Sequence, residues 1–381
     1  MLEKIVMDNY TTFINETAVD FGATSYKFLS ENVENKILKG CLFVGENASG
    51  KTKILLSIKF LLDFLFKDQN VDFLSNKSFY TSKNGYKLGY FFNVLNNKIS
   101  YNLEMNIEGF ISEKLILNDK VIIERLGNTA KLFLNEEKIF DDISTNLSFL
   151  RRVYFDTKFY NNEILNTWFD YLKNSVYVNC NTRNIVTYSG ESLLAHDYLS
   201  REDVTEINKV LKKINYKETI KFSSSMNITK GISFRLNDNK KIILFNKEGT
   251  KVFIPEIFES TGNITLMNLL PTFIHAINNK CIVILDEFSS GFHNELEECL
   301  VKYFFHYTNG SQLFFVSHST NLLNNTILRP DQIYSVTFDG KNGSVVKRFS
   351  SEMPRESQNV EKMYLNGIFN GMPRYNKIFK D

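Results

Sequence analysis

Gly45-Glu-Asn-Ala-Ser-Gly50-Lys51-Thr52 is the stretch that decides the fold, because it fits the phosphate-binding pattern G-x-x-x-x-G-K-[ST]. A β-rich apolar run at 36–44 precedes it, and apolar residues with helical spacing follow from Lys51 to Leu65. An ordinary glycine-containing turn is the alternative, but the strand before the loop and the helix after it favour a phosphate site. The sequence therefore predicts a strand, a glycine-rich loop, and a helix whose N-terminal end faces an anion.

Each part of this loop has an expected role in holding a nucleotide. Gly45 and Gly50 let backbone N–H groups surround phosphate oxygens at positions where a Cβ would intrude. Lys51 is expected to reach the β- and γ-phosphates, and the Thr52 hydroxyl is expected to be a ligand of Mg²⁺. Asn47, in the middle of the loop, is also predicted to bind the nucleotide. The expected cofactors are therefore ATP and Mg²⁺.

Two adjacent carboxylates follow an apolar strand much later in the chain. The run Cys281–Leu285 leads directly to Asp286 and Glu287. Parallel strands end at a common sheet edge, so these acids should lie beside the phosphate loop. Asp286 would hold Mg²⁺ directly or through water, and Glu287 would orient and deprotonate the attacking water. The alternative is a buried strand whose polar end simply meets solvent.

A third strand, Leu313–Val316, ends in Ser317 and His318. A histidine at this edge could hydrogen-bond the γ-phosphate and thereby sense its presence. Taken alone, such a histidine is usually a surface residue or a satisfied core group, but the two neighbouring motifs favour a catalytic role. His293, which follows the acid pair, is equally consistent with a structural role in a loop.

The order of expected elements predicts an α/β protein. Strands alternate with helices around the three motifs, which is typical of a buried, mostly parallel central sheet. Residues 87–140 alternate apolar and polar positions between turn signals and predict an antiparallel β subdomain. A helical lobe should follow, with its clearest helix beginning at a capping box of Ser200 and Asp203. The expected division is 1–142 for the first part of the ATPase lobe with the phosphate loop and meander, 143–229 for the helical lobe, and 230–381 for the second part of the ATPase lobe.

Bulk composition limits the possible environments and partners. The net charge of the 381 residues is near +2, which argues neither for nor against nucleic acid, since a basic groove can hide inside a neutral total. The cysteines form no Cys-x-x-Cys pair, so neither a zinc site nor a disulfide framework is expected. The sequence shows no signal-peptide pattern and no run of about 18 uncharged apolar residues. These features predict a soluble, cytoplasmic protein with no membrane partner.

Together, the motifs resemble those of ABC-class ATPases of the RecF/SMC type, over roughly residues 1–66 and 230–381. The resemblance implies a Ser-x-Gly signature loop that opens a helix upstream of the acid strand, and Ser260-Thr-Gly262 stands at that place. By analogy, Ser260 and Gly262 would contact the γ-phosphate held by a second subunit, so that ATP joins a homodimer or higher homo-oligomer. The family's glutamine loop has no identifiable counterpart, because Gln69 is the only glutamine in the interval.

Several departures from that family narrow the resemblance. The middle of the chain has no long coiled coil and no Cys-x-x-Cys hook, unlike chromosome-tethering members, and no acidic nuclease module follows the ATPase, unlike OLD-type nucleases. The stretch Tyr364–Pro373 looks like the Gly-aromatic-Gly-x-Pro ending of compact bacterial ATPases from abortive-infection and anti-phage operons. The ATPase subunits of PARIS-type and AbiL-type systems are the nearest kind.

The resemblance implies an ATP-hydrolysing regulatory subunit of a bacterial anti-phage defence system. It would control a separately encoded effector nuclease or toxin through ATP-dependent assembly. The alternative is a RecF-like DNA-binding clamp in repair, for which nucleic acid would be the main ligand. A scaffold that binds ATP without turnover is a third hypothesis, and Glu287 argues against it, because a scaffold does not need a base to activate water.

Overall fold

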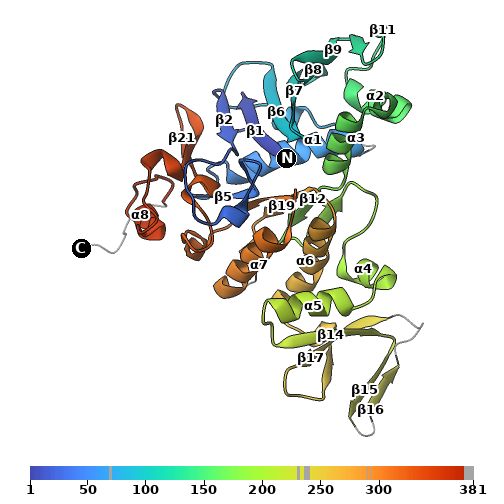
Figure 1. Ribbon diagram of the computed structural model, residues 1–381, viewed down its shortest axis with the longest axis vertical. Helices are drawn as coiled ribbons and strands as arrows, with labels where there is room; N and C mark the ends of the chain where they lie inside the picture. Colours follow the sequence, from blue (N-terminus) through green and yellow to red (C-terminus); the bar gives the residue numbers. More distant parts are fainter. Residues whose placement is uncertain (68–70, 230–231, 236–240, 290, 292, 373–381) are drawn as a thin grey trace.

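The central sheet has seven strands in a computed structural model of the chain (Figure 1). The structure describes residues 1–67, 71–229, 232–235, 241–289, 291 and 293–372. The strand order is β13 (Asn184–Thr187), β12 (Val176–Asn179), β19 (Ile282–Asp286), β20 (Gln312–Val316), β5 (Gly40–Gly45), β21 (Ile333–Asp339) and β22 (Gly343–Arg348). The five inner strands pair in parallel, and only the two outer strands run antiparallel to their neighbours. The predicted mostly parallel central sheet is therefore confirmed.

A second sheet of eight strands is antiparallel throughout. Its order is β11 (Glu137–Phe140), β10 (Thr129–Phe133), β9 (Lys120–Leu126), β8 (Gly109–Leu117), β7 (Asn97–Asn106), β6 (Tyr86–Val94), β1 (Leu2–Asp8) and β2 (Thr17–Asp20). Strands β6 to β11 confirm the meander predicted for 87–140. The first two strands of the chain extend the same sheet, so the antiparallel subdomain is larger than the meander alone.

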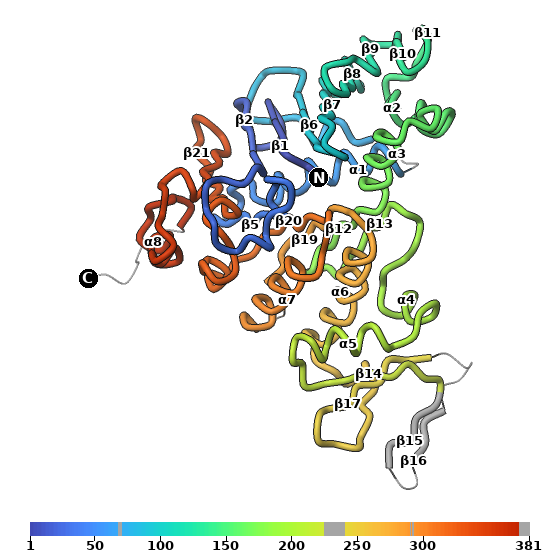
Figure 2. Tube along the Cα trace, in the orientation of Figure 1, coloured from blue at the N-terminus to red at the C-terminus, as the bar shows by residue number. Residues whose placement is uncertain are grey.

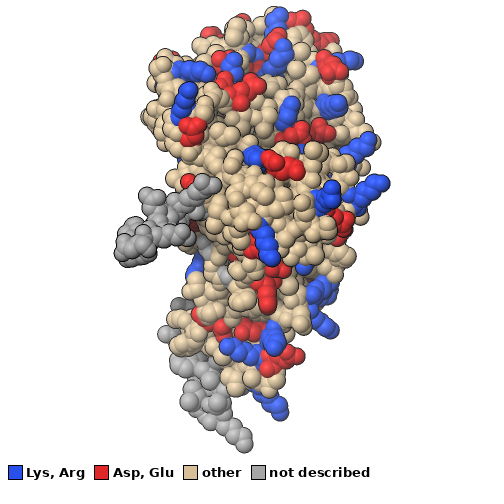
Figure 3. Space-filling view, turned by 90° about the vertical axis from the view of Figure 1, so that its left-hand side faces the viewer, with Lys and Arg blue, Asp and Glu red and all other residues tan. Residues whose placement is uncertain are grey.

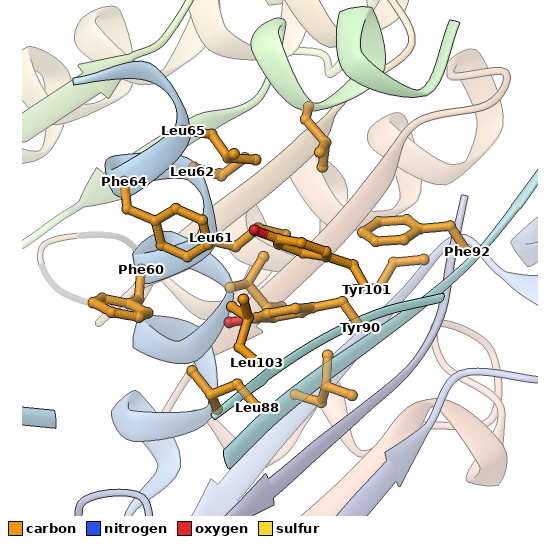
Figure 4. Close-up of a cluster of buried hydrophobic side chains, with 14 of the residues drawn as sticks. Phe60, Leu61, Leu62, Phe64, Leu65, Leu88, Tyr90, Phe92, Tyr101 and Leu103 are labelled. Carbon is orange, nitrogen blue, oxygen red and sulfur yellow. The ribbon is translucent and has the colours of Figure 1, made fainter. Parts of the chain in front are cut away.

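Helix α1 (Lys51–Phe66) lies between the two sheets and supplies much of their common core. Figure 4 shows its apolar face packed against side chains of β6 and β7. The ring of Phe64 lies 6.3 Å from that of Tyr101, and the Tyr90 hydroxyl donates to the carbonyl of Ser57 within the helix (2.7 Å). Burying an apolar helix face between two sheets is the main stabilising term in such a layer.

The other face of the central sheet is covered by two long helices (Figure 1). These are α6 (Thr261–Asn278) and α7 (Asn294–Tyr307). Because both faces are covered, β19 and β20 are buried along their whole length and are apolar except for Asp286 at the end of β19 and Gln312 at the start of β20. Short elements outside these layers include β3 (Val33–Glu34), β4 (Ile37–Leu38) and α8 (Val360–Leu365). In the part of the chain that the structure describes, no helix is long and apolar enough to cross a membrane.

The segment 143–229, where a helical lobe is expected, combines helices with strands. It holds α2 (Phe149–Thr157), α3 (Glu163–Lys173), α4 (Ala195–Arg201), α5 (Thr205–Lys213), and the two sheet strands β12 and β13. Strand β14 (Glu218–Ser223) pairs with β17 (Ile242–Lys247), which pairs with β18 (Phe253–Pro255), and this small sheet projects beyond α5 (Figure 2). Strands β15 (Ser225–Thr229) and β16 (Ile232–Arg235) form a separate pair. Strands of three to six residues carry too little periodicity to be recognised inside a helical stretch.

The predicted capping box at Ser200 and Asp203 is wrong in detail. Ser200 lies inside α4, where its hydroxyl donates to the carbonyl of His196 (2.7 Å). Helix α5 begins later, at Thr205, and the Asp203 carboxylate accepts from the Thr205 backbone N–H (2.7 Å). A local side chain–backbone turn has therefore replaced the i, i+3 box. The apolar residues on one face of α5 are nevertheless buried: Ile207, Val210 and Leu211.

A buried ion pair fastens the start of α2 to the antiparallel sheet. The side chains of Glu113 on β8 and Arg125 on β9 are both 0% exposed, with Nη1 3.4 Å from Oε2. Glu113 accepts four further hydrogen bonds, from the Tyr101 and Ser148 hydroxyls and the Phe149 and Leu150 backbone N–H groups. Arg125 donates to three backbone carbonyls, those of Gly127, Leu147 and Ser144. Each charge is thus fully compensated.

Glu113→Gln should lower the free energy of unfolding by about 3–5 kcal/mol, because it leaves the Arg125 guanidinium buried without a counter-charge. The matched control is Glu124→Gln. Glu124 pairs with Lys114 at the next position on the same two strands, but that pair is exposed, so the cost should stay below about 1 kcal/mol. Urea unfolding of both variants measures the difference, and equal costs would contradict a special role for the buried pair.

Candidate functional site

Three strand ends meet at one edge of the central sheet. Strand β20 lies between β5 and β19 and pairs in parallel with both, so the three carboxyl ends point the same way. The loop 45–52 follows β5, the acid pair 286–287 ends β19, and 317–318 follow β20. Segments more than 230 positions apart in the sequence therefore share one edge, which is where open α/β sheets hold their ligands.

The phosphate loop is shaped by its two glycines. Gly45 has φ of 146°, and a Cβ there would collide with the carbonyl oxygen of Val336 on β21. Gly50, with φ of 107°, is the N-cap of α1, and a Cβ would meet the hydroxyls of Ser344 and Thr12. Both positions require glycine for conformation and for space. Asn47 is exposed at the tip of the loop.

The Lys51 side chain folds back onto the phosphate loop. Its side chain is held by the loop's own carbonyls, with Nζ donating to the oxygens of Gly45 (2.9 Å) and Glu46 (2.6 Å), and the residue is only 6% exposed. Burial lowers the pKa of Lys51, while the charges of Asp286 and Glu46 oppose the shift. A charged ammonium with only neutral carbonyl partners is ready to exchange them for a phosphate oxygen.

Thr52 and Asp286 are in direct contact. The Thr52 hydroxyl donates to Oδ1 of Asp286 (2.9 Å), and the Tyr177 hydroxyl donates to Oδ2 (3.5 Å). Burial raises the pKa of Asp286, and the hydrogen bond from Thr52 opposes this. Tyr177 belongs to β12, the neighbour of β19, and no sequence signal pointed to it.

These oxygens suit a magnesium ion. A hydroxyl and a buried carboxylate side by side are hard ligands, and a cation would relieve the cost of the buried negative charge. Within the described chain there is no group of three or more His, Cys, Asp or Glu side chains that could hold a metal. Mg²⁺ in nucleotide sites generally takes phosphate oxygens and water as its other ligands.

Glu287 and His318 follow the ends of β19 and β20. Glu287 has φ of 55°, a left-handed conformation that is uncommon outside glycine and is found at functional sites. The His318 side chain is exposed, and its backbone N–H donates to the Ser289 hydroxyl (3.2 Å). Burial and the charge of Lys51 lower the pKa of His318, with Glu287 opposing. Both of these effects favour the neutral form of the imidazole, which interacts with the charges of Lys51 and Glu287.

The signature pair lies at the start of another helix. Ser260 is the N-cap of α6, and its exposed hydroxyl accepts the Asn263 backbone N–H (3.2 Å). Gly262 lies close to the carbonyl of Gly291, where a Cβ would intrude. Among the residues described, no hydrogen bond or ion pair joins Ser260 or Gly262 to the loop 45–52. Within one chain, the structure therefore brings together the loop, the acid pair and His318, and leaves the signature pair apart from them.

The C-terminal motif braces the base of the phosphate loop. Gly371 lies against Gly45, and its carbonyl accepts from the Tyr364 hydroxyl (2.9 Å). The Phe369 ring stacks on Phe349 with centroids 3.8 Å apart. Pro373, the last residue of the predicted motif, lies outside the described residues, as does Gln69. The other histidine considered, His293, caps α7 by accepting from the Glu295 N–H (3.4 Å).

Comparisons with known proteins gave one matching family. A protein-family model described as "AAA domain, putative AbiEii toxin, Type IV TA system" matches residues 42–324, a range from β5 to beyond β20. A comparison with curated protein sequences gave no match.

Three solved structures that are similar to the chain are SMC heads. The SMC head domain from Thermotoga maritima is 14% identical, with 91% of this chain and 97% of that chain covered and a TM-score of 0.47. The SmcHead bound to the C-winged helix domain of ScpA is 13% identical, with coverage of 92% and 99% and a TM-score of 0.49. The Smc head with an extended coiled coil bound to the C-terminal domain of ScpA, derived from Pyrococcus furiosus, is 11% identical, with coverage of 92% and 97% and a TM-score of 0.49.

Lys51→Ala should abolish measurable nucleotide binding, because the cation held over the loop mouth is lost. Lys53→Ala is the matched control, since Lys53 lies in the same first turn of α1 outside the loop pattern, and should keep its affinity. Isothermal calorimetry with ATP and Mg²⁺ compares the two. Wild-type affinity in the Lys51 variant would exclude this loop as the nucleotide site.

Proposed function

We propose that this chain, which belongs to the AAA-domain family whose model it matches, is a Mg²⁺-dependent ATPase of the ABC type. One observation carries the proposal: the Thr52 hydroxyl and the Asp286 carboxylate are 2.9 Å apart beside Lys51, at the shared edge of three parallel strands. This is the hydroxyl–carboxylate–lysine arrangement that binds a nucleoside triphosphate with its metal.

Each residue would have a separate task in hydrolysis. Backbone N–H groups of the loop and the N-terminal end of α1 surround the phosphates, and Lys51 exchanges its two carbonyl partners for phosphate oxygens. Mg²⁺, when bound by Thr52 and Asp286, supplies positive charge to the phosphates. Glu287 accepts a proton from the attacking water. The neutral His318 imidazole donates a hydrogen bond toward the γ-phosphate.

Glu287→Gln should bind ATP with Mg²⁺ normally and release phosphate about 10²–10⁴ times more slowly, because the amide keeps the shape and loses the base. Glu295→Gln, an exposed position at the start of α7, serves as the control and should keep wild-type turnover. Steady-state phosphate release measures both. Unchanged turnover in the Glu287 variant would assign the base to another group.

The signature pair points to assembly of at least two copies. Ser260 is exposed at the N-terminus of an 18-residue helix, where free N–H groups and the helix dipole favour an anion. Gly262 leaves room for a close approach. Since neither residue contacts the phosphate loop of its own chain, we assign them to the γ-phosphate bound by another copy. ATP would then hold a homodimer or a higher homo-oligomer together.

A mixing experiment tests this assembly. Ser260→Arg should abolish turnover but leave ATP binding intact, because the loop 45–52 is untouched. When it is mixed with Lys51→Ala, each mixed dimer has one site with both lesions and one site with neither. About a quarter of wild-type activity should return if half of the dimers are mixed and sites act independently. No recovery on mixing, together with normal hydrolysis by Ser260→Arg alone, would exclude the trans arrangement.

The biological setting that we propose is bacterial anti-phage defence. The description of the matched family names a toxin and a type IV toxin–antitoxin system, which supports this setting. The C-terminal motif packed under the phosphate loop supports the compact PARIS-type or AbiL-type branch. In this role, the ATPase would control a separately encoded effector nuclease or toxin through ATP-dependent assembly.

A RecF-like DNA clamp is the competing hypothesis. On the face drawn in Figure 3, basic and acidic side chains are intermingled, whereas a DNA-tracking surface would show a basic stripe. The face drawn in Figure 3 therefore gives no support to the DNA clamp. The gene beside this one discriminates between the hypotheses: a toxin or Toprim-like nuclease gene supports defence, and replication genes would support the clamp.

A further inference from the structure

A buried glutamate lies under the turn that carries His318. Glu297 is on α7, and the residue is 0% exposed. Its Oε2 is 3.4 Å from the Ser317 hydroxyl, which donates to it, and the Ser319 side chain lies next to the same carboxyl. Both serines are themselves buried, whereas His318 between them is exposed. The carboxyl therefore interacts with Ser317 and Ser319, the two residues on either side of His318.

This carboxyl is not fully compensated. Within the described part of the chain, Glu297 Oε1 and the Ser319 hydroxyl are both buried without a hydrogen-bond partner. The Ser317 hydroxyl accepts a hydrogen bond from the Ser319 backbone N–H (3.0 Å) and donates one to Glu297 Oε2. A proton on Oε1 would give the carboxyl a donor, and the Ser319 hydroxyl could accept from it. An ionised carboxylate at the same place would be a buried charge without a cation.

The turn above Glu297 is fixed to the active site by backbone contacts. The Phe288 N–H donates to the carbonyl of Val316 (2.9 Å), and the His318 N–H donates to the Ser289 hydroxyl (3.2 Å). A change in the hydrogen bonding of Ser317 or Ser319 would therefore shift His318 relative to Glu287. The phosphate loop and Thr52 lie outside this turn.

We propose that Glu297 is a positioning residue whose protonated carboxyl holds the Ser317–Ser319 turn, and with it His318, in the arrangement that supports turnover. The inference rests on the ATPase proposed above and adds a regulatory feature to it. Loss of the proton leaves a buried charge under the turn, so the turn relaxes and hydrolysis slows while ATP binding persists.

The surroundings of Glu297 place its loss of a proton near neutral pH. Burial raises the pKa of Glu297 to about 7, against the opposing effect of the Ser319 and Ser317 hydroxyls, and the charge of Glu298 on the same helix adds to the rise. The Cys180 thiol, from another part of the chain, also interacts with this carboxyl; burial raises the pKa of Cys180 to about 12, so it stays neutral. His318, within the turn, interacts with the charges of Lys51 and Glu287.

Glu297→Gln in the full-length chain is the test, because the amide is a permanently neutral mimic of the acid. The ratio of its kcat to that of wild type should be near one at pH 6 and should rise roughly tenfold by pH 8, as a group with pKa near 7 titrates. ATP affinity measured by calorimetry should be the same for both. Glu295→Gln, at an exposed position on the same helix, is the control and should give a flat ratio. A flat ratio for Glu297→Gln would overturn the proposal.

Two further measurements keep the test decisive. The folded-state pKa of Glu297 is above its ordinary value, so wild type loses stability relative to Glu297→Gln as pH rises from about 4.5 to 7. The difference in melting temperature should grow over that window and then level off; a pH-independent difference would overturn the proposal.

If Glu297→Gln does not fold, Ser319→Ala is the second variant. It should remove the fall in kcat between pH 6 and 8 without weakening ATP binding, and an unchanged fall would count against the proposal.

The experiments distinguish failure of the proposed ATPase function from failure of the proposed role of Glu297. If wild type releases no phosphate at any pH, the proposed ATPase function is wrong, and the melting-temperature measurement still reports on the buried carboxyl. If wild type hydrolyses ATP and its ratio to Glu297→Gln is constant, the ATPase stands and the role of Glu297 is overturned.

Discussion

Parallel hydrogen bonding of β20 to both β5 and β19 holds the three strand ends at one edge of the central sheet. The phosphate loop, the acid pair and His318 have their relative positions only because of this pairing. The strands are buried on both faces, so their backbone groups have no alternative partner in water, and the register is strongly fixed. The chemistry at the edge thus depends on the apolar packing behind it.

The opposite end of β20 connects the two sheets. Gln312 is fully buried, and its Oε1 accepts from the Leu2 N–H (2.6 Å) and the Tyr171 hydroxyl (2.7 Å). Its Nε2 donates to the carbonyls of Leu2 and Leu38 (both 2.9 Å). One amide thereby ties the first strand of the antiparallel sheet and α3 to the central sheet. A buried polar group with all its hydrogen bonds satisfied specifies a single arrangement of the layers that it joins.

Buried acids in this fold differ in how completely they are compensated, and the difference follows their proposed tasks. Glu113 has a guanidinium and four other donors, which suits a permanent structural charge. Asp286 has two hydroxyl donors and, among the residues described, no salt bridge, which suits a residue that receives a metal ion. Glu297 has one serine and an oxygen without a partner, which suits a residue that takes up a proton. The deficit in hydrogen bonding marks where a ligand or proton is expected.

The sequence alone determined the features that are local along the chain. Glycine spacing and helical periodicity are read within about twenty residues, so the strand, the loop and α1 follow from 36–65 directly. Apolar runs that end in Asp286 and His318 predict strands with polar ends. The tertiary structure decided what depends on packing between distant segments: the place of β20 between β5 and β19, the four-residue strand β12 that brings Tyr177 to Asp286, and the burial of Glu297 under its turn. Strand order and the burial of a single acid leave no periodic trace in sequence, because they are set by which faces meet after the chain collapses.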